Sequence, residues 1–178
     1  MNQIINKLNT SFPLHFSSPA RKSAIAIIIY KENNELKLIL TERSNQLKNH
    51  AGEISFPGGT YDFEDLNLFG TAIRETKEEL NIDLNKNEYI GQLNDVWTLT
   101  GYIIRPFVFY INKPISYNYN SDEIQSVLDI PLSFFREKTN KTHSLITYQK
   151  RKWNSYIYNY KGHKVWGATA NILNSLFS

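Results

Sequence analysis

The feature of this sequence that most constrains its fold is an unbroken apolar run from Ala24 to Tyr30. The run is far too short to cross a bilayer as a helix. Four of its residues are isoleucines, whose branched side chains favour extended backbone. A short, continuous apolar run of this kind is typical of a buried strand. We therefore expect residues 21–30 to form such a strand.

Further strands and helices are predicted on both sides of this run. Apolar, β-branched and aromatic segments predict strands at 36–41, 90–99, 103–111 and 124–130, and a hairpin of 143–148 with 156–160. Helices are predicted at 2–10, 67–80, 132–136 and 165–177, with Pro131 opening the third. Loops are predicted at 32–35, at 113–120 and over most of 41–59. This mixed order predicts an α+β fold, with a central mixed sheet flanked by helices.

The composition limits the classes of protein to which this chain can belong. A length of 178 residues suits one domain with a real core, and 41% hydrophobic with 21% charged residues is typical of a globular chain. Cysteine is absent, which excludes disulfides, thiolate zinc sites and a catalytic thiol. The N-terminus lacks a basic region followed by an apolar core, so we expect no signal peptide and a cytoplasmic location.

Charge is unevenly distributed along the chain. The net charge is +3, but no Asp or Glu occurs from Lys138 to Ser178, where basic residues gather. Two interpretations stay open, a solvated basic face and the attraction of a polyanionic ligand. Nucleic-acid and membrane partners are not expected, because neither a recognised binding motif nor a long apolar span is present.

The segment 67–80 carries the clearest chemical signal. Glu75, Glu78 and Glu79 are spaced i, i+3, i+4 and share one face of the predicted helix. Like charges at this spacing repel one another, and Arg74, four residues before Glu78, relieves part of that repulsion. Asn81 is predicted to end the helix as a left-handed cap. The opposite face is predicted to pack through Phe69, Ile73, Thr76 and Leu80.

The glutamate triplet has two interpretations. Carboxylate oxygens are the ligands that Mg²⁺ and Mn²⁺ prefer, so the triplet predicts a divalent-metal site. The alternative is an ordinary solvated acidic face. The preceding pair Gly58-Gly59 favours the metal site, because glycine lets backbone approach a phosphate closely, although a tight turn is its simpler role.

Together, the glycines and the glutamates resemble the Nudix box, the glycine-then-Arg-Glu-x-x-Glu-Glu signature of diphosphate hydrolases. Gly59 takes the place of the box glycine, and the core is contained in Arg74-Glu75-Thr76-Lys77-Glu78-Glu79. Asp65 stands six residues after Gly59, where the box has a Glu, and the loop from there to Arg74 is one residue longer than the general pattern. Asn81 replaces the usual glycine near the helix end.

A second motif is similar to one that marks the coenzyme A pyrophosphatase branch of Nudix hydrolases. It comprises Ile39-Leu40-Thr41-Glu42-Arg43-Ser44, then Lys48, Gly52 and Phe56-Pro57-Gly58-Gly59. Lys48 stands where the branch usually has arginine, which keeps the charge but loses bidentate pairing with phosphate. Weaker similarity extends the resemblance over roughly residues 22–176.

The resemblance implies one Nudix-type α/β/α sandwich over 1–178, with an N-terminal helix and lead-in at 1–20 and the box at 59–82. It implies Mg²⁺- or Mn²⁺-dependent hydrolysis of a diphosphate bond, most directly of coenzyme A or its derivatives to 3′,5′-ADP and 4′-phosphopantetheine. The implied metal ligands are Glu75, Glu79 and Glu78, and the implied catalytic residues are Glu78, Glu75 and Arg74. Substrate contacts are implied for Arg43, Lys48, Gly58 and Gly59. Weaker candidates are Glu123 as an added ligand or base, Asp65 as a supporting acid and Tyr102 as a pocket-lining side chain.

Two alternatives to this function stay open. The first is a Nudix hydrolase of another nucleoside diphosphate derivative, such as ADP-ribose, NADH or an oxidised nucleotide. The second is a non-catalytic Nudix-fold binding module, although such modules usually lose the glutamates that this chain keeps. In each case the expected partner is a small-molecule diphosphate, and the sequence is compatible with a homodimer.

Overall fold

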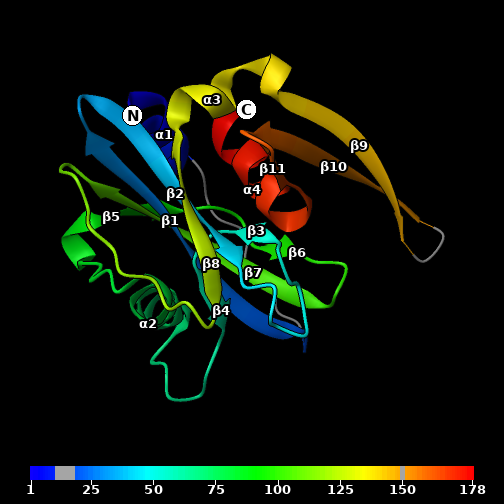
Figure 1. Ribbon diagram of the computed structural model, residues 1–178, viewed down its shortest axis with the longest axis horizontal. Coiled ribbons are helices and arrows are strands. Elements are labelled where there is room, and N and C mark those ends of the chain that lie inside the picture. Colours follow the sequence, from blue (N-terminus) through cyan, green and yellow to red (C-terminus); the bar gives the residue numbers. More distant parts are fainter. Residues whose placement is uncertain (11–18, 149–150) are drawn as a thin grey trace.

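A mixed sheet forms the centre of the molecule (Figure 1). The computed structural model describes residues 1–10, 19–148 and 151–178. The strands of this sheet are β1 (Arg21–Glu32), β2 (Glu35–Arg43), β3 (Ile54–Ser55), β4 (Gly58–Thr60), β5 (Tyr89–Gln92), β6 (Val96–Trp97), β7 (Tyr102–Ile111) and β8 (Ile124–Pro131). Their order is β3-β2-β1-β7-β5, while β4 pairs with β1, β6 with β7 and β8 with β2. Strands β1 and β7 run parallel, and their other described pairings are antiparallel.

Helices cover both faces of this sheet (Figure 1). Helix α2 (Leu68–Leu80) packs on one face, and α1 (Asn2–Thr10), α3 (Leu132–Arg136) and α4 (Gly167–Phe177) pack on the other. The predicted α+β fold, with a mixed central sheet flanked by helices, is confirmed. Within the described ranges, no helix has both the length and the apolar character needed to cross a membrane.

A second, smaller sheet follows the main one in the chain. It has the order β11-β10-β9 and is built from β9 (Lys141–Tyr148), β10 (Arg151–Tyr160) and β11 (His163–Val165). Strand β10 packs against α4, and the β9–β10 hairpin projects from the body of the molecule (Figure 1). Short 3-10 turns, η1 (Lys86–Glu88) and η2 (Lys138–Asn140), precede β5 and β9.

Strand β1 is buried on both faces, which explains its unbroken apolar sequence. Successive side chains of a strand point to opposite faces of the sheet, so alternate residues enter two different cores. These are Ile25, Ile27 and Ile29 on the α4 side, and Ala24, Ala26, Ile28 and Tyr30 on the α2 side. The predicted buried strand is therefore confirmed, and it serves both layers of helices at once.

Most other predicted elements are present, with small shifts at their ends. The helix predicted at 67–80 is α2, and the hairpin loop predicted at 32–35 narrows to Asn33 and Asn34, whose φ angles are 48° and 64°. The predicted hairpin of 143–148 with 156–160 is β9 with β10, and β10 begins nearer the turn than expected. Residues 149–150 of that turn lie outside the described residues.

The prediction that 41–59 forms mostly loop holds for residues 44–53, but strands border that loop on both sides. Strand β2 continues beyond its predicted end, and the short strands β3 and β4 follow. Gly58 and Gly59 lie in β4, where they pair with Ile25 and Ala24 of β1. A Cβ atom on Gly58 would overlap the carbonyl oxygen of Ala24 and the Cα of Ile25. Glycine thus permits an antiparallel approach that the loop prediction did not consider.

The single strand predicted at 90–99 is wrong, because the structure divides it into β5 and β6. A register shift between Tyr89 and Gly91 makes the pairing of β5 with β7 irregular, and β5 then ends at Gln92. In the gap that follows, Asp95 turns inward and pairs with Arg105 of β7 at 2.8 Å. The buried carboxylate of Asp95 needs this cationic partner, and the segment bends to provide it.

Gly58→Ala should destabilise the fold strongly, because the added methyl group meets β1 backbone rather than a movable side chain. We expect the free energy of unfolding to fall by about 2–4 kcal/mol, measured by urea denaturation. Gly101→Ala is the matched control, since Gly101 has a φ of 85° but open space where the new methyl group would lie. That variant should lose only about 1–2 kcal/mol from backbone strain. Equal losses in the two variants would show that the β4–β1 contact is not tight.

Candidate active site

Helix α2 is fixed at both ends by asparagine. The side chain of Asn67 accepts a hydrogen bond from the N–H of Gly70 at 3.0 Å and caps the N-terminus. Asn81 has the left-handed conformation predicted for it, and its N–H donates to the carbonyl of Lys77 at 2.9 Å. Because α2 packs against both β1 and β4, its buried face meets the glycines of β4.

Glu79 lies on the buried side of α2, where it is only 4% exposed. The N–H of Gly58 donates to Glu79 Oε2 at 3.3 Å. Burial, reinforced by the negative charge of Glu75, raises the pKa of Glu79 to about 8. The predicted separation between an acidic face and a packing face is therefore wrong, since Glu79 belongs to both.

Glu75 and Glu78 lie progressively nearer the solvent. Glu75 packs against the backbone of Gly59, and a Cβ atom on that glycine would overlap its carboxyl group. Burial raises the pKa of Glu75, while the charge of Arg74 opposes the rise. Glu78 is open to solvent, with 54% of its side chain exposed. The three glutamates thus form a gradient from the core beneath β4 to the surface.

Arg74 connects these acids to the loop before α2. Its Nη1 lies 3.0 Å from Glu75 Oε1 and 2.9 Å from Glu78 Oε2. On the other side, its Nε and Nη2 donate to the two carboxylate oxygens of Asp65 at 2.9 and 3.0 Å. This hydrogen bonding from Arg74 holds the pKa of Asp65 far below its usual range. Asp65 therefore holds the guanidinium group of Arg74 through both carboxylate oxygens.

Glu123 reaches the same place from the loop before β8. Its negative charge contributes to the raised pKa values of Glu75 and Glu79, which places all three carboxylates in one electrostatic cluster. Its backbone carbonyl accepts a hydrogen bond from the N–H of Ser44 at 2.8 Å. The fold thus brings the charge of this weaker candidate within range of Glu75 and Glu79.

Residues 117–123 form a strap loop that is tied to the end of α2. The N–H of Asn118 donates to the carbonyl of Leu80 at 3.0 Å, and the N–H of Asn120 donates to the carbonyl of Glu79 at 2.9 Å. Helix C-termini leave such carbonyls without partners inside the helix, and here the strap loop supplies the donors. The backbone of Glu79 and the side chain of Glu123 are consequently held by one segment.

Sequence reasoning missed two tyrosines that meet at Asp129, and one of them, Tyr117, anchors the strap loop. The hydroxyl of Tyr117 donates to Asp129 Oδ2 at 2.6 Å, and the hydroxyl of Tyr30 donates to Oδ1 of the same carboxylate at 2.7 Å. Tyr117 was expected only in an exposed loop. No spacing in the sequence marks this group, because its members come from β1, β8 and the strap loop.

Of the predicted cationic and aromatic site residues, Arg43 is the one whose charge acts on the carboxylates. Arg43 ends β2, and its positive charge lowers the pKa of Glu79 against the larger effect of burial. Lys48 is exposed in the loop between β2 and β3. Tyr102 begins β7, and its hydroxyl accepts a hydrogen bond from Arg21 Nη1 at 3.2 Å. No described contact joins Lys48 or Tyr102 to the carboxylates.

Four carboxylates could supply oxygen ligands to a divalent cation: Glu75, Glu78, Glu79 and Glu123. Among the residues that the structure describes, no three acidic or histidine side chains converge closely enough to form a ready-made metal cluster. Arg74 explains the spread, because one of its nitrogens holds both Glu75 and Glu78. The donor set still suits Mg²⁺ or Mn²⁺, since it consists of hard oxygens carrying negative charge that is incompletely balanced.

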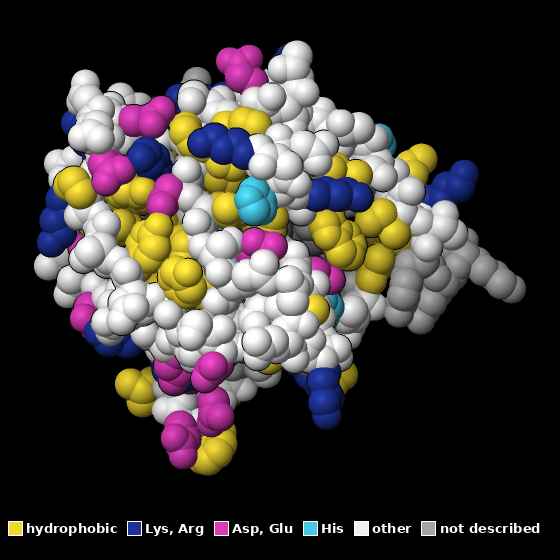
Figure 2. Space-filling view, viewed as in Figure 1, with side chains coloured by type: hydrophobic (Ala, Val, Ile, Leu, Met, Phe, Trp, Pro, Cys, Tyr) yellow, Lys and Arg dark blue, Asp and Glu magenta, His cyan; other side chains and the backbone are white. Residues whose placement is uncertain are grey.

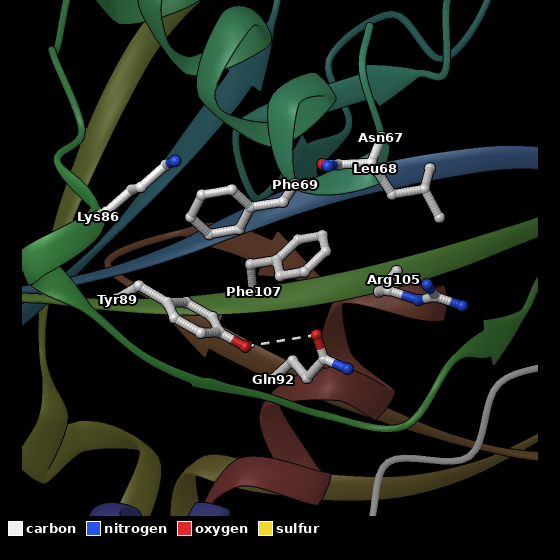
Figure 3. A pocket seen from close by; sticks show the side chains of 8 residues that line it. All are labelled: Asn67, Leu68, Phe69, Lys86, Tyr89, Gln92, Arg105 and Phe107. Atoms are coloured by element: carbon white, nitrogen blue, oxygen red, sulfur yellow. Dashed lines mark hydrogen bonds between the residues drawn. The ribbon is translucent and has the colours of Figure 1, made fainter.

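A separate cleft of about 450 Å³ lies at the start of α2 (Figure 3). Phe69 and Phe107 occupy its middle, and Lys86 and Arg105 stand toward opposite ends. None of the residues lining this cleft is a predicted site residue. The carboxylate cluster and the cleft are therefore two distinct features of the same helix.

Comparison with known proteins points to one family. The family model for the NUDIX domain matches residues 20–130. A protein of Photorhabdus laumondii described as an uncharacterized Nudix hydrolase NudL is 33% identical over 165 residues, which cover 92% of this chain and 87% of the relative. A relative of the same description from Citrobacter koseri is 36% identical over 160 residues, which cover 88% of this chain and 81% of the relative.

Solved structures share the fold at lower sequence identity. A MutT/nudix family protein from Enterococcus faecalis has a TM-score of 0.62 and 12% identity, covering 99% of this chain and 68% of that one. The NUDIX domain of Shewanella oneidensis NrtR, solved in complex with ADP ribose, has a TM-score of 0.54 and 20% identity. The match covers 72% of this chain and 82% of that one. At such identities, the likeness shows the fold alone.

The raised pKa of Glu79 should make stability depend on pH when metal is chelated. An acid that holds its proton more tightly in the folded state stabilises the fold below its ordinary pKa of 4.5 and loses that contribution as the pH rises through about 8. Between these values we expect the free energy of unfolding to fall by about 2–4 kcal/mol relative to Glu79→Gln, which cannot ionise. Chemical denaturation across this pH range in EDTA measures the difference. Glu35→Gln, on the exposed hairpin, should follow the parent protein, and parallel curves for Glu79→Gln and the parent would contradict the assignment.

Removing the Tyr117 hydroxyl should loosen the strap loop. We expect Tyr117→Phe to speed hydrogen exchange at the amides of Asn118 and Asn120, because both amides depend on the position of that loop. Tyr30→Phe is the matched control, since it removes a hydrogen bond to the same Asp129 carboxylate from outside the loop. Each variant should lose about 1–3 kcal/mol of stability, but only the first should change exchange locally. Equal protection of the Asn118 and Asn120 amides in the two variants would mean that Tyr117 does not anchor the loop.

Proposed function

Because this chain belongs to the Nudix hydrolase family, we propose that it hydrolyses a diphosphate bond with Mg²⁺ or Mn²⁺, and that coenzyme A or a derivative is the substrate. The expected products are 3′,5′-ADP and 4′-phosphopantetheine. The observation that carries this proposal is the contact of Gly59 with Glu75 and of Gly58 with Glu79, within range of the negative charge of Glu123. Such an array of partly buried acids is costly unless cations and a charged substrate share the site.

Glu75 and Glu79 are the proposed principal metal ligands, with Glu78 or Glu123 completing the set. When bound, the ion activates water as a Lewis acid and screens the charge of the diphosphate. Glu75 and Glu78 can turn from Arg74 toward a cation, since each is held there by a contact near the surface. Arg74 would keep the carboxylates oriented, because Asp65 fixes its guanidinium group from behind.

Two residues are candidates for the base that takes a proton from the attacking water. Glu78 is solvent-exposed on α2, and Glu123 approaches the same cluster on the strap loop. Either carboxylate can accept a proton in its ionised form. The strap loop supports a role for Glu123, because it ties that side chain to the helix that carries the proposed ligands.

Phosphate groups would be held by positive charge and by exposed backbone. Arg43 lies close enough to the cluster to influence Glu79, and Lys48 is on the adjacent loop. The glycines of β4 carry no side chains that would keep a phosphate away from the backbone. The coenzyme A assignment depends on the motif spanning 39–59, whose two ends supply Arg43 and the glycines to this one site.

The second candidate substrate is ADP-ribose or another nucleoside diphosphate derivative. It is favoured by the solved NUDIX domain of NrtR, which shares the fold and was solved with ADP ribose. That fold would carry the same proposed carboxylate chemistry, so the two candidates differ in the residues that contact the rest of the substrate. A non-catalytic binding module is a weaker third candidate, because the chain keeps the three helix glutamates Glu75, Glu78 and Glu79.

Incubation of the purified full chain with coenzyme A, ADP-ribose, NADH and a nucleoside triphosphate tests the proposal. Each reaction is run with Mg²⁺, with Mn²⁺ and with EDTA, and the products are separated by chromatography. We expect 3′,5′-ADP to be released preferentially from coenzyme A, and only when metal is present. Cleavage of the other compounds alone would make the coenzyme A assignment wrong. Metal-independent binding without cleavage of any compound would favour the binding module.

The carboxylates of α2 should be essential for turnover. We expect Glu79→Gln and Glu75→Gln to lower kcat by about a hundredfold or more, because each removes a charged ligand without changing side-chain size. Glu35→Gln, far from the site on the β1–β2 hairpin, is the matched control and should keep normal kcat. Circular dichroism establishes that the variants are folded. Near-normal turnover of Glu79→Gln would refute the metal assignment.

A further inference from the structure

The loop between β4 and α2 exposes two large apolar side chains almost completely. Phe63 is 86% exposed and Leu66 is 96% exposed. Figure 2 shows carboxylates and apolar side chains together at the lower end of the molecule, where Figure 1 places this loop. The carboxylates are Asp62 and Glu64, which flank Phe63 in the sequence. We call residues 61–66 the acidic knob.

The acidic knob is held in shape by its own hydrogen bonds. The N–H groups of Asp62 and Glu64 donate to Asp65 Oδ2 and Asp62 Oδ1 at 3.1 and 3.0 Å. The hydroxyl of Tyr61 donates to the carbonyl of Asp65 at 3.2 Å. Ordered exposure of large apolar groups is costly in water and marks a surface that another molecule covers.

The cleft of Figure 3 has the complementary chemistry. Its floor is aromatic, and the rings of Phe69 and Phe107 meet edge to face with centroids 5.3 Å apart. Lys86 is exposed toward one end, and Arg105 stands toward the other, fixed by hydrogen bonds of 2.8 and 2.9 Å to Asp95. Because Asp95 already neutralises Arg105, Lys86 is the cation left for a partner, and an aromatic ring beside a carboxylate would place apolar surface on the floor and negative charge near Lys86.

The knob and the cleft of one molecule are neighbours along the chain, but they do not meet. Asn67 follows the knob directly, lines the cleft and caps α2, whereas Phe63 and Leu66 stay in solvent. A second copy of the chain can supply what is missing at both places. A two-fold axis relating the two copies would form two identical contacts of this kind. A membrane surface fits poorly, because carboxylates surround the apolar side chains.

We propose that two copies of this chain associate through this surface, with the acidic knob of each copy inserted in the aromatic cleft of the other. Phe63 is the main anchor, and Glu64 faces Lys86 of the partner. The apolar groups involved cover less area than the interfaces of permanent dimers, so the association is weak and depends on concentration. The residues that would contact the partner, Phe63, Glu64 and Lys86, are not among the proposed site residues, so the inference does not depend on the proposed reaction.

Sedimentation equilibrium of the full chain over a wide range of concentration tests the proposal. We expect a reversible monomer–dimer equilibrium, and Phe63→Ser should weaken association by about tenfold or more. Charge reversal gives a sharper test. Glu64→Lys and Lys86→Glu should each weaken the dimer, and the double variant should recover most of the lost affinity because the paired charges are exchanged. Leu145→Ser, at a 56% exposed site on β9, is the matched control and should leave association unchanged.

Other outcomes would overturn the proposal. A chain that stays monomeric at every concentration has no such interface. A dimer that is insensitive to both Phe63→Ser and Lys86→Glu uses another surface. If Phe63→Ser instead raises KM for a cleaved diphosphate while the protein remains monomeric, the knob contacts substrate. Thermal unfolding establishes that each variant is folded, which we expect because Phe63 and Lys86 are exposed.

Discussion

The contact on which the site depends is the fit of two adjacent glycines between a strand and a helix. Gly58 lies directly against the backbone of β1, and Gly59 lies directly against the carboxyl group of Glu75. The helix can therefore approach the sheet closely enough to bury Glu79 and receive the N–H of Gly58. Burial then raises the pKa values of both glutamates. The raised pKa values of Glu75 and Glu79 therefore depend on the lack of side chains at Gly58 and Gly59.

The acidic side chains around this contact differ in how well their charges are paired. Arg74 is saturated by acids, with Asp65 behind it and Glu75 and Glu78 in front. Glu79 has only a backbone N–H as a described hydrogen-bond donor, with Arg43 acting from a distance. The acids around Arg74 therefore have a cationic partner, whereas the inner residue Glu79 has no comparable one among its described contacts. A divalent cation is the counter-charge that suits Glu79 best.

Sequence reasoning succeeded where local pattern determines the outcome. The run 24–30 is typical of a buried strand, and the C-terminal cap and glutamate spacing of α2 are properties of a single helix. It failed where the outcome depends on contacts between distant segments. Helical periodicity placed Glu79 on a solvent face, because the sequence does not reveal that β4 lies over it. Tyr117 and Asp129 escaped notice for the same reason, since their partnership exists only once β8 and the strap loop are in place.

The glycine contact also determines which parts of this protein can diversify. A side chain at Gly58 or Gly59 would displace β1 or Glu75, so β4 can contribute only backbone to whatever molecule lies above the carboxylates. The remaining walls come from the segment between β2 and β3 and from the strap loop, whose side chains are mainly directed to solvent. Apart from Glu123 and the anchor Tyr117, residues of those two loops can be exchanged without disturbing the carboxylates beneath them. The glycines of β4 are thus fixed by packing, whereas the two surrounding loops are otherwise free to vary. New substrate preferences can therefore arise through substitutions in these loops alone.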